Sequence, residues 1–293
     1  MIRYIWVNGK RAVAPLAPIP VAYTEALHAL TAAIGDLYME AFAAPREDNG
    51  SNRLRGNRFA IVDILRKTDR VRGLSEHNIS ILTDRLLEAL DFHTVIDTTA
   101  AAIIRDANTG FERLIQSSAK GRKLKTALQV IDIRARHETS RFVPLFRRNN
   151  TGLIRALVSK QVEATENVLA KHYGKHVVEL SAEIQATTGA TKSHANLLAR
   201  DQTLKLNSDI QQFRSQSVGA TKYTWITSND ERVRGRPGGK WADSDSNHWK
   251  LHGLVFEYNS PPVTNSKKGI RLNPGRDFQC RCTASPNLDH IFA

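Results

Sequence analysis

Apolar residues at helical spacing occupy most of the chain between residues 21 and 140. Recurrence at steps of three and four predicts helices over residues 21–42, 59–65, 75–105, 112–118 and 124–136. Ser75 is a suitable N-cap for the third of these helices, and Asn108-Thr-Gly110 is expected to end it. The polar residues 45–57 are expected to form a loop. This region is therefore predicted to be all-helical, and it carries no enzyme signature.

The first twenty residues show no helical pattern. Pro15, Pro18 and Pro20 exclude a helix there, because proline lacks the backbone donor and fixes its own φ. An irregular arm is expected, in which Met1 to Val7 forms a short strand.

Helical periodicity returns after residue 149 and continues to about residue 217. The pattern predicts helices over residues 152–172, 175–186 and 192–216. Gly189 suits a C-terminal cap and Thr191 an N-cap, so the second helix is expected to stop there and the third to start.

Beyond residue 220 the pattern changes from helix to strand. Tyr223–Thr227, Leu254–Tyr258 and Cys280–Ala284 are rich in β-formers, and turn residues such as Asn273-Pro-Gly275 separate them. The Gly-rich and Ser-rich residues 235–247 are expected to form an exposed loop that Trp241 anchors. The fold class is therefore α+β: largely helical N-terminal and middle regions, then a small C-terminal module of short antiparallel strands.

The composition adds a charge argument. The chain of 293 residues has a net charge of +13, which favours a polyanionic partner, with nucleic acid foremost. The densest basic run contains Lys120, Arg122, Lys123 and Lys125, and it is expected to face packaged DNA, an acidic protein surface or solvent. No apolar stretch is long enough to span a bilayer, and the N-terminus lacks the regions of a signal peptide, so we expect no membrane contact.

Several motifs occur in one order between residues 200 and 282. They comprise the family positions Arg200, Asp201, Gln202, Trp225, Thr227, Asp230, Arg232, Arg234, His248, Gly253, Pro274, Gly275, Cys280, Arg281 and Cys282. Such an ordered run resembles the head-morphogenesis domain of the phage Mu protein F family, the minor head proteins of tailed phages. The similarity covers about residues 149–288. Some relatives carry a Cys-Xaa2-Cys pair where this chain has Val233-Arg-Gly-Arg236.

The resemblance implies a structural minor head protein that acts in head morphogenesis near the portal. Its implied partners are the portal protein and other capsid or scaffold proteins, together with double-stranded DNA. Its implied location is the phage head, after assembly in the host cytoplasm. Two regions are expected: residues 1–148, a helical part that contacts portal or capsid, and residues 149–293, with helices over 152–217 and a strand-containing module over 221–288.

The candidate chemistry lies in the module. We expect no cofactor and a buried, hydrogen-bonded role for both cysteines and His248; the alternative is a zinc ion at His248, Cys280 and Cys282, with Asp230 or His252 as a fourth ligand. Asp230 is expected to pair with Arg232 and Arg234 in its turn. A second function class remains open, a metal-dependent nuclease or toxin-like enzyme built from Asp230, Asp243, His248 and His252.

Overall fold

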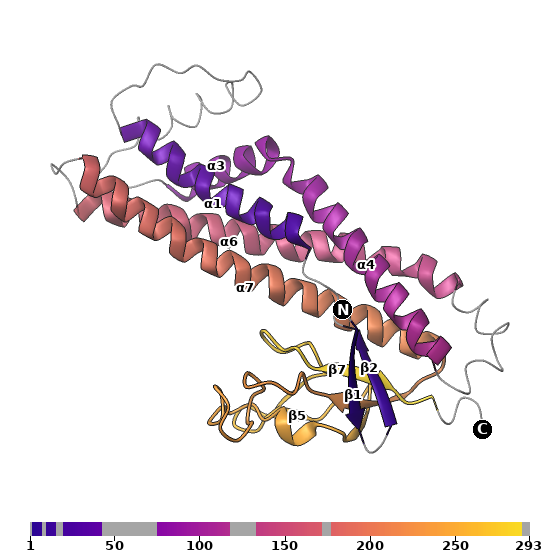
Figure 1. Cartoon of the computed structure of the whole chain (residues 1–293). Helices are drawn as coiled ribbons and strands as arrows, with labels where there is room; N and C mark the ends of the chain where they lie inside the picture. The colour runs from indigo at the N-terminus through magenta and orange to yellow at the C-terminus, as the bar shows by residue number, and fades with distance from the viewer. Residues whose placement is uncertain are drawn as a thin grey trace. The chain divides into compact units, whose positions relative to one another are not determined.

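The computed structural model describes residues 2–7, 10–15, 20–42, 75–117, 133–171 and 177–288. The loop predicted at 45–57, the helix predicted at 59–65 and the basic run from Lys120 to Lys125 lie outside them. The described residues confirm the fold class, with long helices followed by short antiparallel strands (Figure 1). None of the described helices combines the length and the apolar character needed to cross a membrane.

The chain forms two compact units that interleave along the sequence. One comprises residues 21–99 and 146–199, and the other comprises residues 1–20, 100–145 and 200–293. The boundary predicted between residues 148 and 149 lies inside a helix, Phe142–Lys171. As a statement about domains that fold independently, that boundary stays a prediction.

The first unit is a set of helices packed along their lengths (Figure 1). It contains α1 (Val21–Phe42), α3 (Glu76–Ala89) and parts of three longer helices, α4 (Phe92–Ser117), α6 (Phe142–Lys171) and α7 (Val177–Ser217). The apolar stripe of α1 is buried, as its spacing predicted, with Leu27, Leu30 and Ile34 at 0% exposure. Ser75 caps α3 as expected, because its Oγ accepts a hydrogen bond from the N–H of Asn78.

Two predicted helix ends are wrong. The predicted 75–105 helix breaks instead at Asp91, which has a positive φ of 46°, and α4 then continues through Asn108-Thr-Gly110 to Ser117. Asn108 is held inside the helix because its side chain donates to Thr139 Oγ1 and accepts from Arg214. Tertiary partners of this kind outweigh a weak local preference for a turn.

The stop and restart predicted at Gly189 and Thr191 is also wrong, since α7 is continuous. The hydroxyls of Thr187, Thr188 and Thr191 donate to carbonyls one helical turn earlier, so they satisfy themselves within the helix instead of capping a new one. Thr188 also accepts from Gln161 of α6, which ties this part of α7 to its neighbour.

The second unit contains the strands. A three-stranded antiparallel sheet has the order β4-β3-β7, formed by Val255–Glu257, Lys222–Ile226 and Thr283–Pro286. A hairpin of β1 (Ile2–Val7) and β2 (Lys10–Pro15) lies beside β7 (Figure 1). A smaller hairpin pairs β5 (Val263–Asn265) with β6 (Ile270–Arg271).

The strand predictions are partly right. Strands at 223–227 and 254–258 are confirmed as β3 and β4, and the predicted strand at Met1–Val7 is confirmed as β1. The last strand is shifted, because β7 begins at Thr283 and leaves Cys280 and Cys282 in the segment before it. Strand β2, which pairs with β1, and strands β5 and β6, which pair with each other, were not predicted from the sequence. Short single-turn 3-10 helices occur at Thr139–Arg141 (η1) and Trp249–Leu251 (η2).

Candidate functional site

The family positions Arg200 and Asp201 on α7 form hydrogen bonds with the segment that carries the cysteines. Asp201 is 5% exposed, and its Oδ1 accepts a hydrogen bond from the backbone N–H of Gln279 at 2.8 Å. Its Oδ2 accepts from Nζ of Lys205 at 2.6 Å, one turn along the helix. Arg200 reaches the side-chain oxygen of Gln279 at 3.4 Å. Two adjacent family positions therefore attach the helix to the residue directly before Cys280.

The Asn273-Pro-Gly275 turn docks on the same helix. Ser208 donates to the carbonyl of Pro274 at 2.6 Å. Gly275 has a φ of 82°, and a Cβ there would lie 2.9 Å from Cβ of Ser208. Both the backbone conformation and the close approach of α7 thus require glycine at this position.

Trp225 and Thr227 belong to β3 and the residue after it. Trp225 is fully buried in a cluster with Tyr223, Tyr258 and the two cysteines. Thr227 contacts His252 twice, because its N–H donates to Nδ1 at 3.1 Å and its hydroxyl lies 3.0 Å from the same atom. The N–H of Gly253 donates to the carbonyl of Trp225 at 2.8 Å, so the chain folds back onto the strand at this glycine, whose φ is 80°.

Asp230 does not form the side-chain pairs that its neighbours suggested. Its carboxylate instead binds both terminal nitrogens of Arg281, each at 2.6 Å, and accepts from the backbone N–H of Arg232. Arg234 pairs with Asp277 at 2.7 Å. Burial raises the pKa of Asp230, but the hydrogen bonds from Arg281 and Arg232 outweigh burial and hold that pKa below its usual value.

This pair predicts a pH-dependent stability. Asp230→Asn should lower the free energy of unfolding by about 1–2 kcal/mol at pH 7, the low end for a hydrogen-bonded charge that is partly exposed. Because the folded pKa is lowered, the ionised form stabilises the fold above the unfolded pKa, and this contribution is lost as the pH falls through the folded pKa. Urea unfolding of wild type and variant from pH 7 down to pH 3 measures the difference, which should shrink. A constant difference would contradict the assignment to charge.

The imidazole ring of His248 approaches the sulfurs of both cysteines. Its Nδ1 is 3.4 Å from Sγ of Cys280 and 3.7 Å from Sγ of Cys282, and all three side chains are buried. Its Nε2 lies 3.2 Å from a carboxylate oxygen of Asp277. The three donor atoms fall within 4.8 Å of one another. Neither Asp230 nor His252 belongs to this group, so the fourth ligand suggested by the sequence is wrong.

The side chains of this cluster shift one another's pKa values. Burial alone lowers the pKa of His248, but hydrogen bonds with Asp277 and Cys280 oppose burial and raise the pKa to about 9. The hydrogen bond from Cys282, together with His248, lowers the pKa of the Cys280 thiol, while the pKa of the Cys282 thiol is raised by Cys280 and by burial.

The residues of the nuclease alternative are not assembled. Asp230 is bound by Arg281, His248 by the cysteines and Asp277, and His252 by Thr227, while Asp243 is exposed. A metal held on a phosphodiester needs these groups around one point. Within the described ranges, the geometry brings together sulfur and imidazole donors instead.

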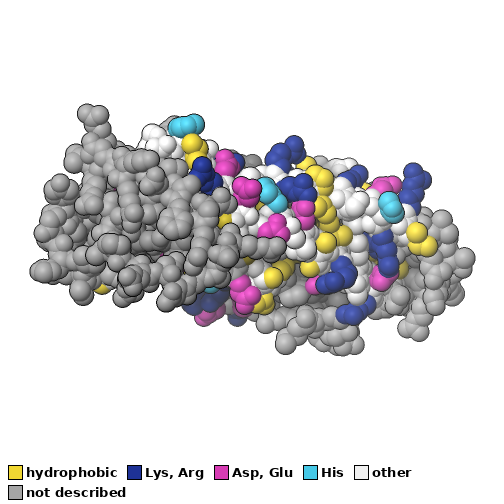
Figure 2. Space-filling view, turned by 90° about the horizontal axis from the view of Figure 1, so that it is seen from above, with side chains coloured by type: hydrophobic (Ala, Val, Ile, Leu, Met, Phe, Trp, Pro, Cys, Tyr) yellow, Lys and Arg dark blue, Asp and Glu magenta, His cyan; other side chains and the backbone are white. Residues whose placement is uncertain are grey.

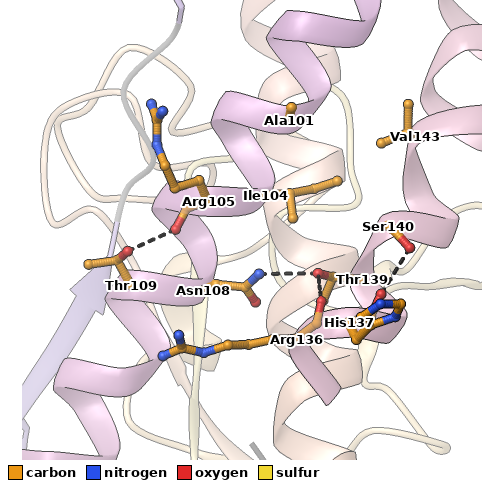
Figure 3. A pocket seen from close by; sticks show the side chains of 10 residues that line it. All are labelled: Ala101, Ile104, Arg105, Asn108, Thr109, Arg136, His137, Thr139, Ser140 and Val143. Carbon is orange, nitrogen blue, oxygen red and sulfur yellow. Dashed lines mark hydrogen bonds between the residues drawn. The ribbon is translucent and has the colours of Figure 1, made fainter. Parts of the chain in front are cut away.

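A separate depression of about 460 Å³ lies beside α4, between it and the residues around η1 (Figure 3). Its hydroxyls donate to nearby backbone carbonyls, Thr109 to that of Arg105 and Ser140 to that of His137. These hydroxyls are therefore occupied by local hydrogen bonds and are not paired with a base, as a nucleophile would be.

Sequence reasoning missed the residues that connect the motifs. Asp277 contacts His248, Gln279 contacts Asp201 and Ser208 contacts Pro274. No pattern in the sequence marks these three contacting residues, apart from their lying near family positions along the chain. The basic candidates Lys120, Arg122, Lys123 and Lys125 lie outside the described residues.

The comparisons with known proteins agree with the motif. Residues 164–285 match the model of the family described as phage Mu protein F like protein. An uncharacterized protein of Haemophilus influenzae is 34% identical over 143 residues, a match that covers 48% of this chain and 28% of the relative. No solved structure matches. Residues 164–285, which contain every motif residue of the site, therefore match the phage Mu protein F-like family, and the family resemblance is confirmed.

Proposed function

We propose that this protein is a structural minor head protein of a tailed phage or prophage, and that it acts in head morphogenesis close to the portal. The observation that carries the proposal is the family match over residues 164–285 together with the contacts that connect its motifs. The family points to phage head morphogenesis; the portal location, the capsid and scaffold partners and the contact with DNA are our finer proposals.

The side chains of the motif support a structural role. Asp201, Ser208, Asp230 and Trp225 hold helix, loop and strand together, and none is left as an exposed acid, base or nucleophile in a cavity. Groups committed to internal contacts of this kind build a rigid module. A rigid module is what a protein needs in order to present a surface to an assembling shell.

Co-sedimentation tests this proposal. The full chain is co-expressed with the portal, capsid and scaffold proteins of the same phage, and procapsids are separated on a density gradient. We expect the protein in the procapsid fractions when the portal is present and at the top of the gradient when the portal is omitted. Recovery at the top in both cases would overturn the proposal.

We further propose that the protein contacts packaged DNA through its basic run. The net charge of +13 supports binding to a polyanion. Figure 2 shows one face of the molecule, on which Lys and Arg side chains lie interspersed with Asp and Glu and do not form a single basic patch. A dense run such as Lys120–Lys125 is therefore a better candidate for phosphate contact than that face.

Salt dependence measures the contribution of the run. Replacing Lys120, Arg122, Lys123 and Lys125 with Gln should flatten the slope of log affinity against log salt by up to about four units, at about 0.9 per lost phosphate contact. Fluorescence anisotropy with random duplexes at several salt concentrations gives the slope.

The control removes the same charge elsewhere, through Gln at the exposed module positions Lys222, Lys240, Lys250 and Lys267. We expect the control to keep most of the slope. An unchanged slope in the first variant, with procapsid incorporation lost, would instead assign the run to a protein partner.

A further inference from the structure

Three metal-binding donors converge in the module from two separate segments. His248 precedes η2, whereas Cys280 and Cys282 lie just before β7. Their exposed fractions are 2%, 4% and 6%, so all three side chains lie inside the module. Imidazole nitrogen and thiolate sulfur are the donors that zinc prefers in proteins.

The distances match a tetrahedral centre. With Zn–S near 2.3 Å and Zn–N near 2.0–2.1 Å, tetrahedral geometry places the bound nitrogen and sulfur about 3.6 Å apart. The two distances from Nδ1 of His248 to the sulfurs, 3.4 and 3.7 Å, lie on either side of that value. These two nitrogen–sulfur distances therefore already have the spacing that a bound zinc ion requires.

A hydrogen bond at Nδ1 of His248 accounts for only one of the two contacts that this atom makes with sulfur. Nδ1 of His248 carries one hydrogen or one lone pair, so it can make a full hydrogen bond with only one of the two sulfurs that approach it. The carboxylate of Asp277 faces Nε2 at 3.2 Å and favours a hydrogen on that nitrogen. Nδ1, which approaches the sulfurs, is therefore the nitrogen that would bind an ion, with release of its own proton. A metal ion at the point of convergence would satisfy all three donors together.

We propose that His248, Cys280 and Cys282 bind one zinc ion, with Asp277 as the residue that orients the histidine. A water molecule completes the four ligands that zinc usually takes. The two thiolates balance the charge of the ion. The ion would join the loop before η2 to the segment before β7, beside the buried Trp225 ring, whose centroid lies 5.4 Å from that of His248. This inference goes beyond the proposed role in head assembly and does not depend on it.

Metal analysis of the tag-free full chain tests the proposal. Protein loaded with zinc and then desalted should retain one equivalent, measured by mass spectrometry of the metal. Cys280→Ser, Cys282→Ser and His248→Gln should each lose it. His252→Gln is the matched control, because this histidine lies in the same module but binds Thr227, and its zinc content should equal that of the wild type.

Two further measurements keep the test decisive if a ligand variant fails to fold. Wild-type protein loaded with Co²⁺ should show thiolate-to-cobalt charge-transfer absorption and the visible bands of a tetrahedral ion. Asp277→Asn should bind zinc about 10–100-fold more weakly, as changes in the residues behind a ligating histidine do.

Two results would overturn the proposal. The first is wild-type protein that retains no more zinc than the cysteine variants and gives no charge-transfer band with cobalt. The second is zinc that the three ligand variants retain in full, since the ion would then bind elsewhere.

Discussion

Trp225→Ala should lower the free energy of unfolding of the C-terminal module by about 3–5 kcal/mol, the usual cost of truncating a large core aromatic. Among the residues whose burial the structure describes, Trp225 is the largest fully buried side chain, and its ring meets those of His248 and Phe256 edge-on. Truncation would leave a cavity against the cysteines at the centre of a small core. Urea unfolding followed by tryptophan fluorescence reports on this region, because Trp241 and Trp249 also lie in the module.

Trp241→Ala is the matched control. This residue is 58% exposed, in contrast to the anchoring role that the sequence suggested, so its removal should change stability by less than about 0.5 kcal/mol. Trp225→Phe should fall between the two, since it keeps an aromatic ring in the core. Equal midpoints for Trp225→Ala and the wild type would show that the cluster around Trp225 does not support the module.

Asp201→Ala should cost about 2–3 kcal/mol, because it leaves the backbone N–H of Gln279 without its acceptor and separates α7 from the cysteine segment. Asp201→Asn keeps an oxygen for Gln279 but weakens the bond to Lys205, so it should cost about half as much. The same urea titration applies to both variants.

Asp209→Ala is the matched control on the same helix. Asp209 pairs with Arg276, and the two side chains are 34% and 42% exposed, so this pair should contribute less than about 1 kcal/mol. A larger loss from Asp209→Ala than from Asp201→Ala would show that the α7 contact depends on surface charge and not on the buried hydrogen bond.

Sequence reasoning succeeded where local pattern and burial coincide. The stripe of α1 and the capping residue Ser75 were recognised because one face of a helix and one cap are properties of neighbouring residues. Strands β3 and β4 followed from β-formers between turns. The family motif was recognised from the order of its residues, and the match over 164–285 confirms it.

Reasoning from the sequence failed where a residue far away along the chain determines a helix end or an ion-pair partner. Asn108 and Gly189 carry the local signature of helix ends, yet both lie inside continuous helices. Arg232 and Arg234 are the nearest cations to Asp230 along the chain, but Arg281, 51 residues away, provides the bidentate partner. Local preferences differ by less than about 1 kcal/mol, so one buried tertiary hydrogen bond is enough to reverse them.

By itself, the sequence determined the α+β class, the order of helices before strands, the family resemblance and the residue types of the proposed metal site. These follow from periodicity and from motif order, which require no knowledge of contacts. Only the tertiary structure decided that Asp201 holds Gln279, that Arg281 binds Asp230 and that Nδ1 of His248 faces both sulfurs. Each of these contacts joins residues between 32 and 78 positions apart, and the folded backbone alone brings such pairs within hydrogen-bonding distance.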